Sequence, residues 1–145
     1  MTRQYPTFVS VVAFALGVLD LVRGVSHTLL SSYAASDVAG LDLSGPTGLD
    51  QLVLMNAFGA ANFLSGAALI YLSLKDRLGT LLFLAVIPLA YLMAGIGLRL
   101  NGADLVGQGV FPGRYMMAGY ISLCFITVFA ALLAIRRQTR GALSF

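Results

Sequence analysis

The sequence predicts an all-α integral membrane protein, a bundle of four transmembrane helices with its N and C termini in the cytoplasm. Of the 145 residues, 59% are hydrophobic and only 10% are charged, and the mean hydropathy is +0.89. A soluble domain carries about 25% charged residues, so this chain has too few charges to cover a surface exposed to water. Long apolar segments and a one-sided distribution of basic residues support the same prediction. Lipid is therefore the expected solvent for most of the surface.

Four apolar segments are long enough to cross a bilayer. They comprise residues 7–32, 51–74, 78–98 and 115–135. At about 1.5 Å per helical residue, roughly 20 residues cross a hydrocarbon core of about 30 Å. The connecting loops at 33–50 and 99–114 are rich in glycine and too short to bury a core of their own. The whole chain, residues 1–145, is therefore predicted to form a single membrane domain.

The first apolar segment carries three ionisable residues on one stripe. At about 100° per residue, Arg23 lies about 60° from Asp20 around the helix, and His27 lies about 20° from it. A charge near the centre of a span costs roughly 2.5–3.5 kcal/mol on insertion scales, so it normally faces the bundle interior and finds a partner. The stripe is therefore expected to point inward.

Two interpretations of this stripe stay open. In the functional one, Asp20, Arg23 and His27 belong to a polar site or proton pathway, with His27 as the group that changes charge near neutral pH. In the structural one, Asp20 and Arg23 form an ion pair that ties the helix to the bundle, and His27 bonds a neighbour.

The second segment offers a stripe of small and amide residues, Gly59, Asn62 and Gly66. Small residues at this spacing let two helices approach closely, and an amide can bond across the contact. Gly59 and Gly66 are therefore predicted to mark a helix-packing face. Asn62 either belongs to that face or contacts a ligand, since an amide both donates and accepts hydrogen bonds.

The third and fourth segments contribute a proline and two deep tyrosines. Pro88 lies in the middle of residues 78–98, where it removes a backbone hydrogen bond and is expected to kink the helix. Tyr91 and Tyr120 lie away from the span ends, and buried hydroxyls need partners. We therefore expect these two tyrosines to form other walls of the site around Asp20.

Basic residues predict the orientation. Most of them fall near the N-terminus, in the hairpin at 75–77 and in the tail: Arg3, Lys75, Arg77, Arg136, Arg137 and Arg140. The loop at 33–50 has no basic residue and three aspartates, while Arg99 and Arg114 border the loop at 99–114. Because short basic loops tend to stay in the cytoplasm, both termini are expected inside and both long loops outside.

Several chemistries find no support in the sequence. It has one cysteine, Cys124, and one histidine, so it offers neither an intrachain disulfide nor a metal cluster, and no metal ligand is predicted. It lacks phosphate-loop and zinc-protease motifs, so no catalytic residue is predicted and the question of an enzymatic activity stays open. The nine basic residues are scattered rather than gathered in a stripe, which argues against nucleic acid as a partner.

The chain resembles the DoxX-like group of small four-helix membrane proteins. The resemblance rests on the first span, on residues 35–45, and on the block Asn-Ala-Phe-Gly-Ala-Ala-Asn-Phe-Leu-Ser-Gly at 56–66, which a basic hairpin follows. Some members of that group are named as membrane partners of quinone-linked oxidations, so the resemblance permits a quinone as cofactor here. It assigns no catalytic residue.

Three functions are compatible with these features. The preferred one is a small multi-pass protein of the cell membrane that binds or passes a small solute, proton or ion at an intramembrane polar site. The alternatives are a redox-associated subunit that binds a quinone or lipid, with His27 and a tyrosine at its carbonyls, and a purely structural assembly protein. The expected partners are the lipid bilayer and either further copies of the chain, as a homo-oligomer, or another membrane protein.

Overall fold

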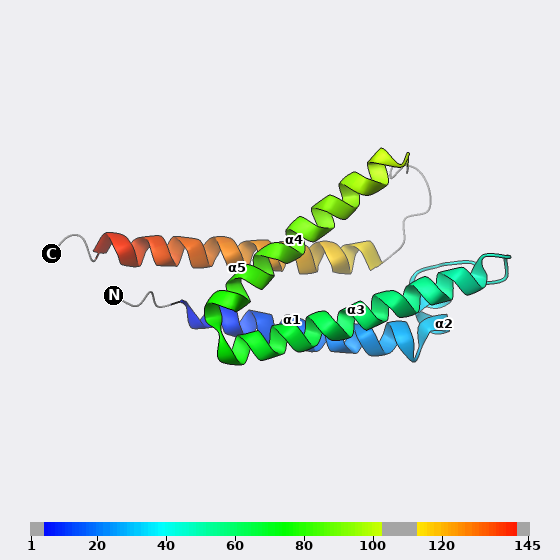
Figure 1. Ribbon diagram of the computed structural model, residues 1–145, viewed down its shortest axis with the longest axis horizontal. Helices are drawn as coiled ribbons and strands as arrows, with labels where there is room; N and C mark the ends of the chain where they lie inside the picture. Colours follow the sequence, from blue (N-terminus) through cyan, green and yellow to red (C-terminus); the bar gives the residue numbers. More distant parts are fainter. Residues whose placement is uncertain (1–4, 103–112, 142–145) are drawn as a thin grey trace.

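The computed structural model describes residues 5–102 and 113–141, and side chains as far as Thr139. Within this part the chain forms only helices and connecting turns (Figure 1). The long helices are α1 (Thr7–Thr28), α3 (Gly48–Lys75), α4 (Arg77–Leu100) and α5 (Gly113–Gly141), and the short ones are α2 (Ser31–Tyr33) and the π-helix η1 (Ala34–Val38). Four helices are long and apolar enough to cross a membrane, which confirms the predicted all-α, multi-pass fold class.

The helix bounds differ from the predicted segments at several ends. Helix α1 stops at Thr28 rather than at residue 32, and the side chain of Thr28 bonds back to the carbonyl of Gly24. The predicted loop at 33–50 holds η1, and α3 already begins at Gly48. Helix α5 continues past residue 135 to Gly141 through three arginines, which are good helix formers. Apolar pattern alone could not mark these ends, because α3 and α5 extend into polar sequence whereas α1 stops before the apolar residues do.

Some sequence predictions fall outside the described residues. These are Arg3, the side chain of Arg140, and residues 103–112, which make up most of the predicted loop at 99–114.

In the described loop at 33–50, the hydroxyl and the backbone N–H of Ser44 both donate to Asp42. Both hydrogen bonds lower the pKa of the exposed Asp42 carboxyl, and the one from the Ser44 hydroxyl has the larger effect.

Helices α1 and α3 form the most extensive interface and run side by side in opposite directions (Figure 1). Glycines on both helices bring the backbones close. A Cβ atom added at Gly66 would stand 2.8 Å from the carbonyl oxygen of Gly17, and one at Gly59 would stand 2.6 Å from Cγ2 of Thr28. Both glycines named from the sequence thus lie in this close contact.

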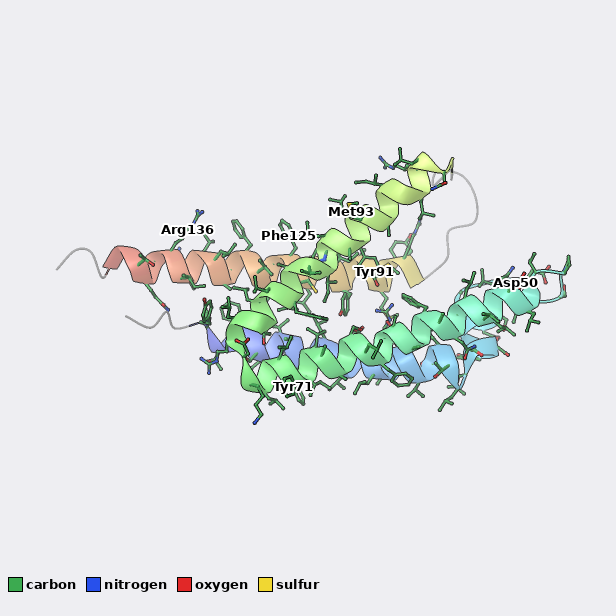
Figure 2. All side chains as sticks on the ribbon, viewed as in Figure 1. Asp50, Tyr71, Tyr91, Met93, Phe125 and Arg136 are labelled. Atoms are coloured by element: carbon green, nitrogen blue, oxygen red, sulfur yellow. The ribbon has the colours of Figure 1, made fainter. Side chains whose placement is uncertain are left out.

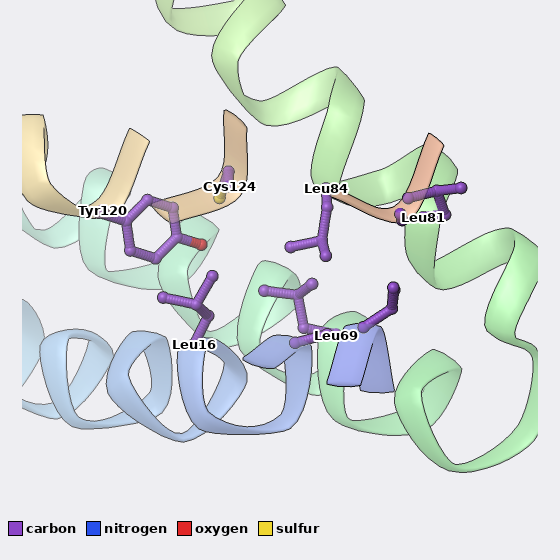
Figure 3. Close-up of a cluster of buried hydrophobic side chains, with 9 residues drawn as sticks. Leu16, Leu69, Leu81, Leu84, Tyr120 and Cys124 are labelled. Carbon is purple, nitrogen blue, oxygen red and sulfur yellow. The ribbon is translucent and has the colours of Figure 1, made fainter. Parts of the chain in front are cut away.

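The remaining helices close one side of this pair around a small apolar core. Leu16 of α1 and Leu69 of α3 meet Leu84 of α4, and Tyr120 and Cys124 of α5 complete the cluster (Figure 3). Cys124 is fully buried and acts as a small packing residue. The core therefore joins all four long helices at one level of the bundle.

Helix α4 leaves the bundle as it proceeds. Its buried residues, Thr80, Leu81 and Leu84, all lie in its first half. From there to Leu100 every residue of α4 is at least partly exposed, and the helix runs away from α1 and α3 (Figure 1). The helix is continuous through Pro88. The second half of α4 therefore has few contacts with the other helices.

The outer surface of the described bundle is largely apolar. Large hydrophobic side chains are exposed on every long helix, among them Val11, Leu64, Met93 and Phe125. Such a surface fits contact with lipid tails, and the four apolar spans imply it. The exposed charged residues lie toward the helix ends and loops, with Asp50 and Arg136 at opposite ends of the molecule (Figure 2).

The α1–α3 contact yields the first prediction. Gly66→Ala places a methyl group 2.8 Å from the backbone oxygen of Gly17, so the helices must separate. We expect the free energy of unfolding in detergent micelles to fall by about 1–3 kcal/mol, as for overpacked cores.

Gly119→Ala is the matched control, because nothing lies within 4 Å of a Cβ at that helical glycine of α5. It should leave stability unchanged or raise it by up to about 1 kcal/mol through helix propensity. Equal losses in both variants would show that Gly66 is not at a close contact.

Candidate functional site

The site is built around the carboxylate of Asp20, which lies inside α1 and is only 3% exposed. Two hydroxyls donate to its Oδ2 atom, Ser65 Oγ of α3 at 2.7 Å and the Tyr120 hydroxyl of α5 at 2.9 Å. Arg23, one turn further along α1, places Nη1 3.5 Å from Oδ1. Side chains from three helices therefore converge on one buried negative charge.

Arg23 is also buried, with 6% of the residue exposed. Its distance to Asp20 is long for a hydrogen bond, so the pair is held mainly by charge attraction. The guanidinium carbon lies 5.5 Å from the ring centre of Phe58 and 5.7 Å from that of Tyr120, which are cation–π distances. Its Nε atom is buried and has no hydrogen-bond partner among the described residues. Aromatic faces thus replace part of the hydration of this cation.

His27 and Asn62 form a second polar pair across the α1–α3 contact. The amide nitrogen of Asn62 lies 2.9 Å from Nδ1 of His27, so Nδ1 accepts the hydrogen bond when the amide donates. The ring of His27 also lies 5.1 Å from that of Phe58, centre to centre. Phe58 therefore links this pair to the Asp20 and Arg23 pair.

A cavity of about 180 Å³ adjoins the Asp20 carboxylate. Its polar lining consists of Asp20, Asn62, Ser65, Tyr91 and Tyr120. An apolar protein cavity of roughly 150 Å³ holds a molecule the size of benzene, so this space can take a small organic molecule or several waters. It is wide enough to bind a ligand.

The position of α4 shapes this cavity. Ile87 and Tyr91 line it from α4, just after the last buried residue of that helix, Leu84. Tyr91 lies on the side of α4 that faces the other helices, whereas Met93 points away (Figure 2). The cavity therefore opens where α4 begins to diverge from the bundle.

The structure places the six site residues predicted from sequence in three settings. Asp20, Asn62, Tyr91 and Tyr120 line the cavity. Arg23 packs beside Asp20 between aromatic rings, and His27 forms a hydrogen bond with Asn62. Neither residue is among the described residues that line the cavity. The three residues of the charged stripe thus lie near one another, but only Asp20 reaches the cavity.

Sequence reasoning missed Ser65 and Phe58. Ser65 lies three residues after Asn62 and Phe58 lies four residues before it, so both share the helix face of Asn62. That spacing was the available signal. It was weak, because a serine and a phenylalanine are ordinary residues in an apolar span.

No protein-family model, curated protein or solved structure matches this chain. Within residues 5–102 and 113–141 no group of three or more His, Cys, Asp or Glu side chains could hold a metal ion. The chemistry of the site therefore comes from one carboxylate, one guanidinium, an amide, an imidazole and several hydroxyls.

The buried pair yields the second prediction. Asp20→Asn or Arg23→Gln leaves one buried charge without its opposite, which for buried pairs costs about 3–5 kcal/mol of unfolding free energy. The double variant removes both charges and should be more stable than either single variant. Unfolding in detergent micelles measures all three.

Asp50→Asn, at an exposed carboxyl in the first turn of α3, is the control and should cost no more than about 1 kcal/mol, the interaction of that carboxylate with the helix dipole. A double variant that is no more stable than the worse single variant would contradict the mutual neutralisation of Asp20 and Arg23.

Proposed function

We propose that this chain is a small multi-pass protein of the cell membrane that binds a small polar solute in the cavity beside Asp20. The observation that carries the proposal is the cavity itself, about 180 Å³ next to a carboxylate in the middle of a span. A charged residue at such depth is expensive and commonly functional. An ion pair with a purely structural role needs no empty space beside it, so the cavity favours binding.

The proposal extends to passage of the solute, a proton or an ion across the membrane. Passage requires the cavity to open toward both sides in turn. The sparse packing of α4 after Leu84 supports such an opening, because little holds that half of the helix against α1 and α3. Asp20 and the hydroxyls of Ser65 and Tyr120 would be the groups that a passing proton or ion meets.

A second candidate, binding of a quinone by a redox-associated subunit, has one observation in its favour. Aromatic side chains line much of the cavity, namely Phe58, Tyr91 and Tyr120, and they suit a flat ring. Membership of the DoxX-like group is part of this candidate. It is supported by the four-span arrangement and by the position of the 56–66 block on α3, against α1.

We also propose that the protein forms homo-oligomers. The support is the second half of α4, whose exposed apolar residues include Leu89, Leu92, Met93 and Ile96. Gly95 and Gly97 lie beside them with open space around each. Small residues on an apolar helix face allow a further helix to approach closely within a bilayer.

The third prediction concerns orientation. Lys75 and Arg77 lie in the α3–α4 hairpin, at the same end of the bundle as the start of α1 and the end of α5 (Figure 1). We expect reporter fusions after Phe145 to report the cytoplasm and insertions within residues 42–48 to report the outside, since basic ends stay inside. A tail that reports the outside would contradict the proposed orientation.

The fourth prediction tests solute binding. Ala61 lines the cavity, and Ala61→Leu fills it without removing a polar group. In lipid nanodiscs free of additives, saturation-transfer NMR should detect wild-type binding of at least one of glycerol, 1,4-dioxane, ethylammonium and methanesulfonate. Ala61→Leu should abolish that signal, because its side chain occupies the space of the solute.

Ala60→Leu is the matched control. Ala60 is the preceding residue of α3, is exposed, and does not belong to the described lining, so its variant should bind as wild type does. If no probe gives a signal that depends on Ala61, the cavity does not bind small solutes and the proposed function is wrong.

A further inference from the structure

The hydrogen-bond pattern of the cavity limits which solutes it can bind. Ser65 and Tyr120 each have one hydroxyl hydrogen. Tyr120 donates to Oδ2 of Asp20, and Ser65 has two acceptors within the protein, Oδ2 of Asp20 at 2.7 Å and the backbone oxygen of Asn62 at 3.2 Å. What these hydroxyls can still offer a ligand is the lone pairs of their oxygens. The Asp20 carboxylate itself only accepts. Three of the polar lining groups therefore present acceptors.

Asn62 adds to this pattern. Its amide nitrogen is directed at Nδ1 of His27, so its amide oxygen is the end that points away from the histidine. That oxygen has no hydrogen-bond partner among the described residues. Tyr91, the remaining polar lining residue, makes no hydrogen bond within the described part of the chain, and its hydroxyl can either donate or accept.

The charges around the cavity cancel. Asp20 contributes one negative charge and Arg23, 3.5 Å away, one positive charge. The guanidinium is enclosed by Phe58 and Tyr120 rather than placed in the described lining, so it does not present its donors to the cavity. A cation that entered would be attracted by the adjacent Asp20 and repelled by Arg23 behind it, so its charge would be only partly compensated, and an anion would meet a wall of acceptor oxygens. Both would leave water at a high cost.

We infer that the cavity takes a small neutral molecule that donates several hydrogen bonds, such as a small polyol or amide. This inference rests on the proposed function and names its ligand class. It opposes an oxidised quinone as the ligand, because quinone carbonyls only accept and would face the oxygens of Asp20, Ser65 and Tyr120. It also opposes organic cations and anions, because the site compensates a further charge only in part, and it narrows the proposed passage to a neutral solute or a proton.

The four probes of the nanodisc experiment separate these classes. Glycerol is neutral and donates through three hydroxyls, whereas 1,4-dioxane has the same number of heavy atoms, is neutral and only accepts. Ethylammonium is a cation, and methanesulfonate is an anion with acceptors alone. We expect glycerol to bind at least tenfold more tightly than each of the other three, since one or two hydrogen bonds to buried acceptors account for a tenfold ratio.

The outcomes distinguish the inference from the proposed function. Binding of dioxane, ethylammonium or methanesulfonate as tightly as glycerol, with loss in Ala61→Leu, would overturn the donor class and leave the proposed function standing. Absence of any Ala61-dependent binding would overturn both. Binding of glycerol that Ala61→Leu leaves intact would also overturn the inference, because the site would lie elsewhere.

A second pair of variants tests the wall of acceptors directly. Tyr91→Phe removes the one uncommitted hydroxyl from the lining and should weaken glycerol severalfold while leaving the thermal midpoint unchanged. Tyr71→Phe is its control, because Tyr71 is 64% exposed on the outer side of α3 and should bind glycerol as wild type does. Unchanged or tighter glycerol binding by Tyr91→Phe would contradict a hydrogen bond between the ligand and Tyr91.

Discussion

The rest of this bundle depends on the need to stabilise one carboxylate in the middle of a membrane span. Inside the span Asp20 is shielded from bulk water, so the protein must supply most of its stabilising contacts. The structure supplies two hydroxyls and one guanidinium from three different helices. These contacts tie α1, α3 and α5 together at one depth. A single polar residue therefore constrains how three apolar helices, which gain little by choosing one another over lipid, are placed around it.

That arrangement in turn depends on the glycines of α1 and α3. Ser65 can reach Asp20, and Asn62 can reach His27, only because the two backbones approach closely. Gly66 follows Ser65 directly and faces Gly17, so the residue that permits the approach is next to the residue that uses it. The close helix contact at Gly66 and the hydrogen bond of Ser65 to Asp20 thus depend on neighbouring residues of α3. The cation of Arg23 benefits as well, since Phe58 of α3 covers one side of it.

Helical periodicity in the sequence predicted the spans and the inward stripe, but it could not predict the hydrogen bonds of the site. The spans follow from apolar length, and the inward stripe of Asp20, Arg23 and His27 follows from an angle of about 100° per residue. The depth of Tyr91 and Tyr120 was enough to place them near the site. Periodicity could not show that Tyr120 donates to Asp20 while Tyr91 stays uncommitted, because that difference depends on how α4 and α5 are positioned in space.

The sequence could not predict the cavity either, because the cavity also depends on how α4 is positioned in space. It exists because α4 is held firmly by Thr80, Leu81 and Leu84 and only loosely afterwards, and apolar residues continue through both halves of the helix. Hydropathy cannot distinguish an apolar side chain that meets another helix from one that meets lipid.

The same packing difference connects binding with the position of α4. Ile87 and Tyr91 line the cavity from the part of α4 that follows its last buried residue, Leu84, opposite Asp20 of α1 and Ser65 of α3. Under the proposed function, a solute that donates to Tyr91 and to the Asp20 group at once would join this part of α4 to the other helices. A bound ligand would thus add contacts to a part of α4 that has few of its own, so binding would hold that part against α1 and α3. A small neutral donor is suited to this bridging, because it satisfies acceptors on both walls without adding a charge to a site whose own charges already cancel.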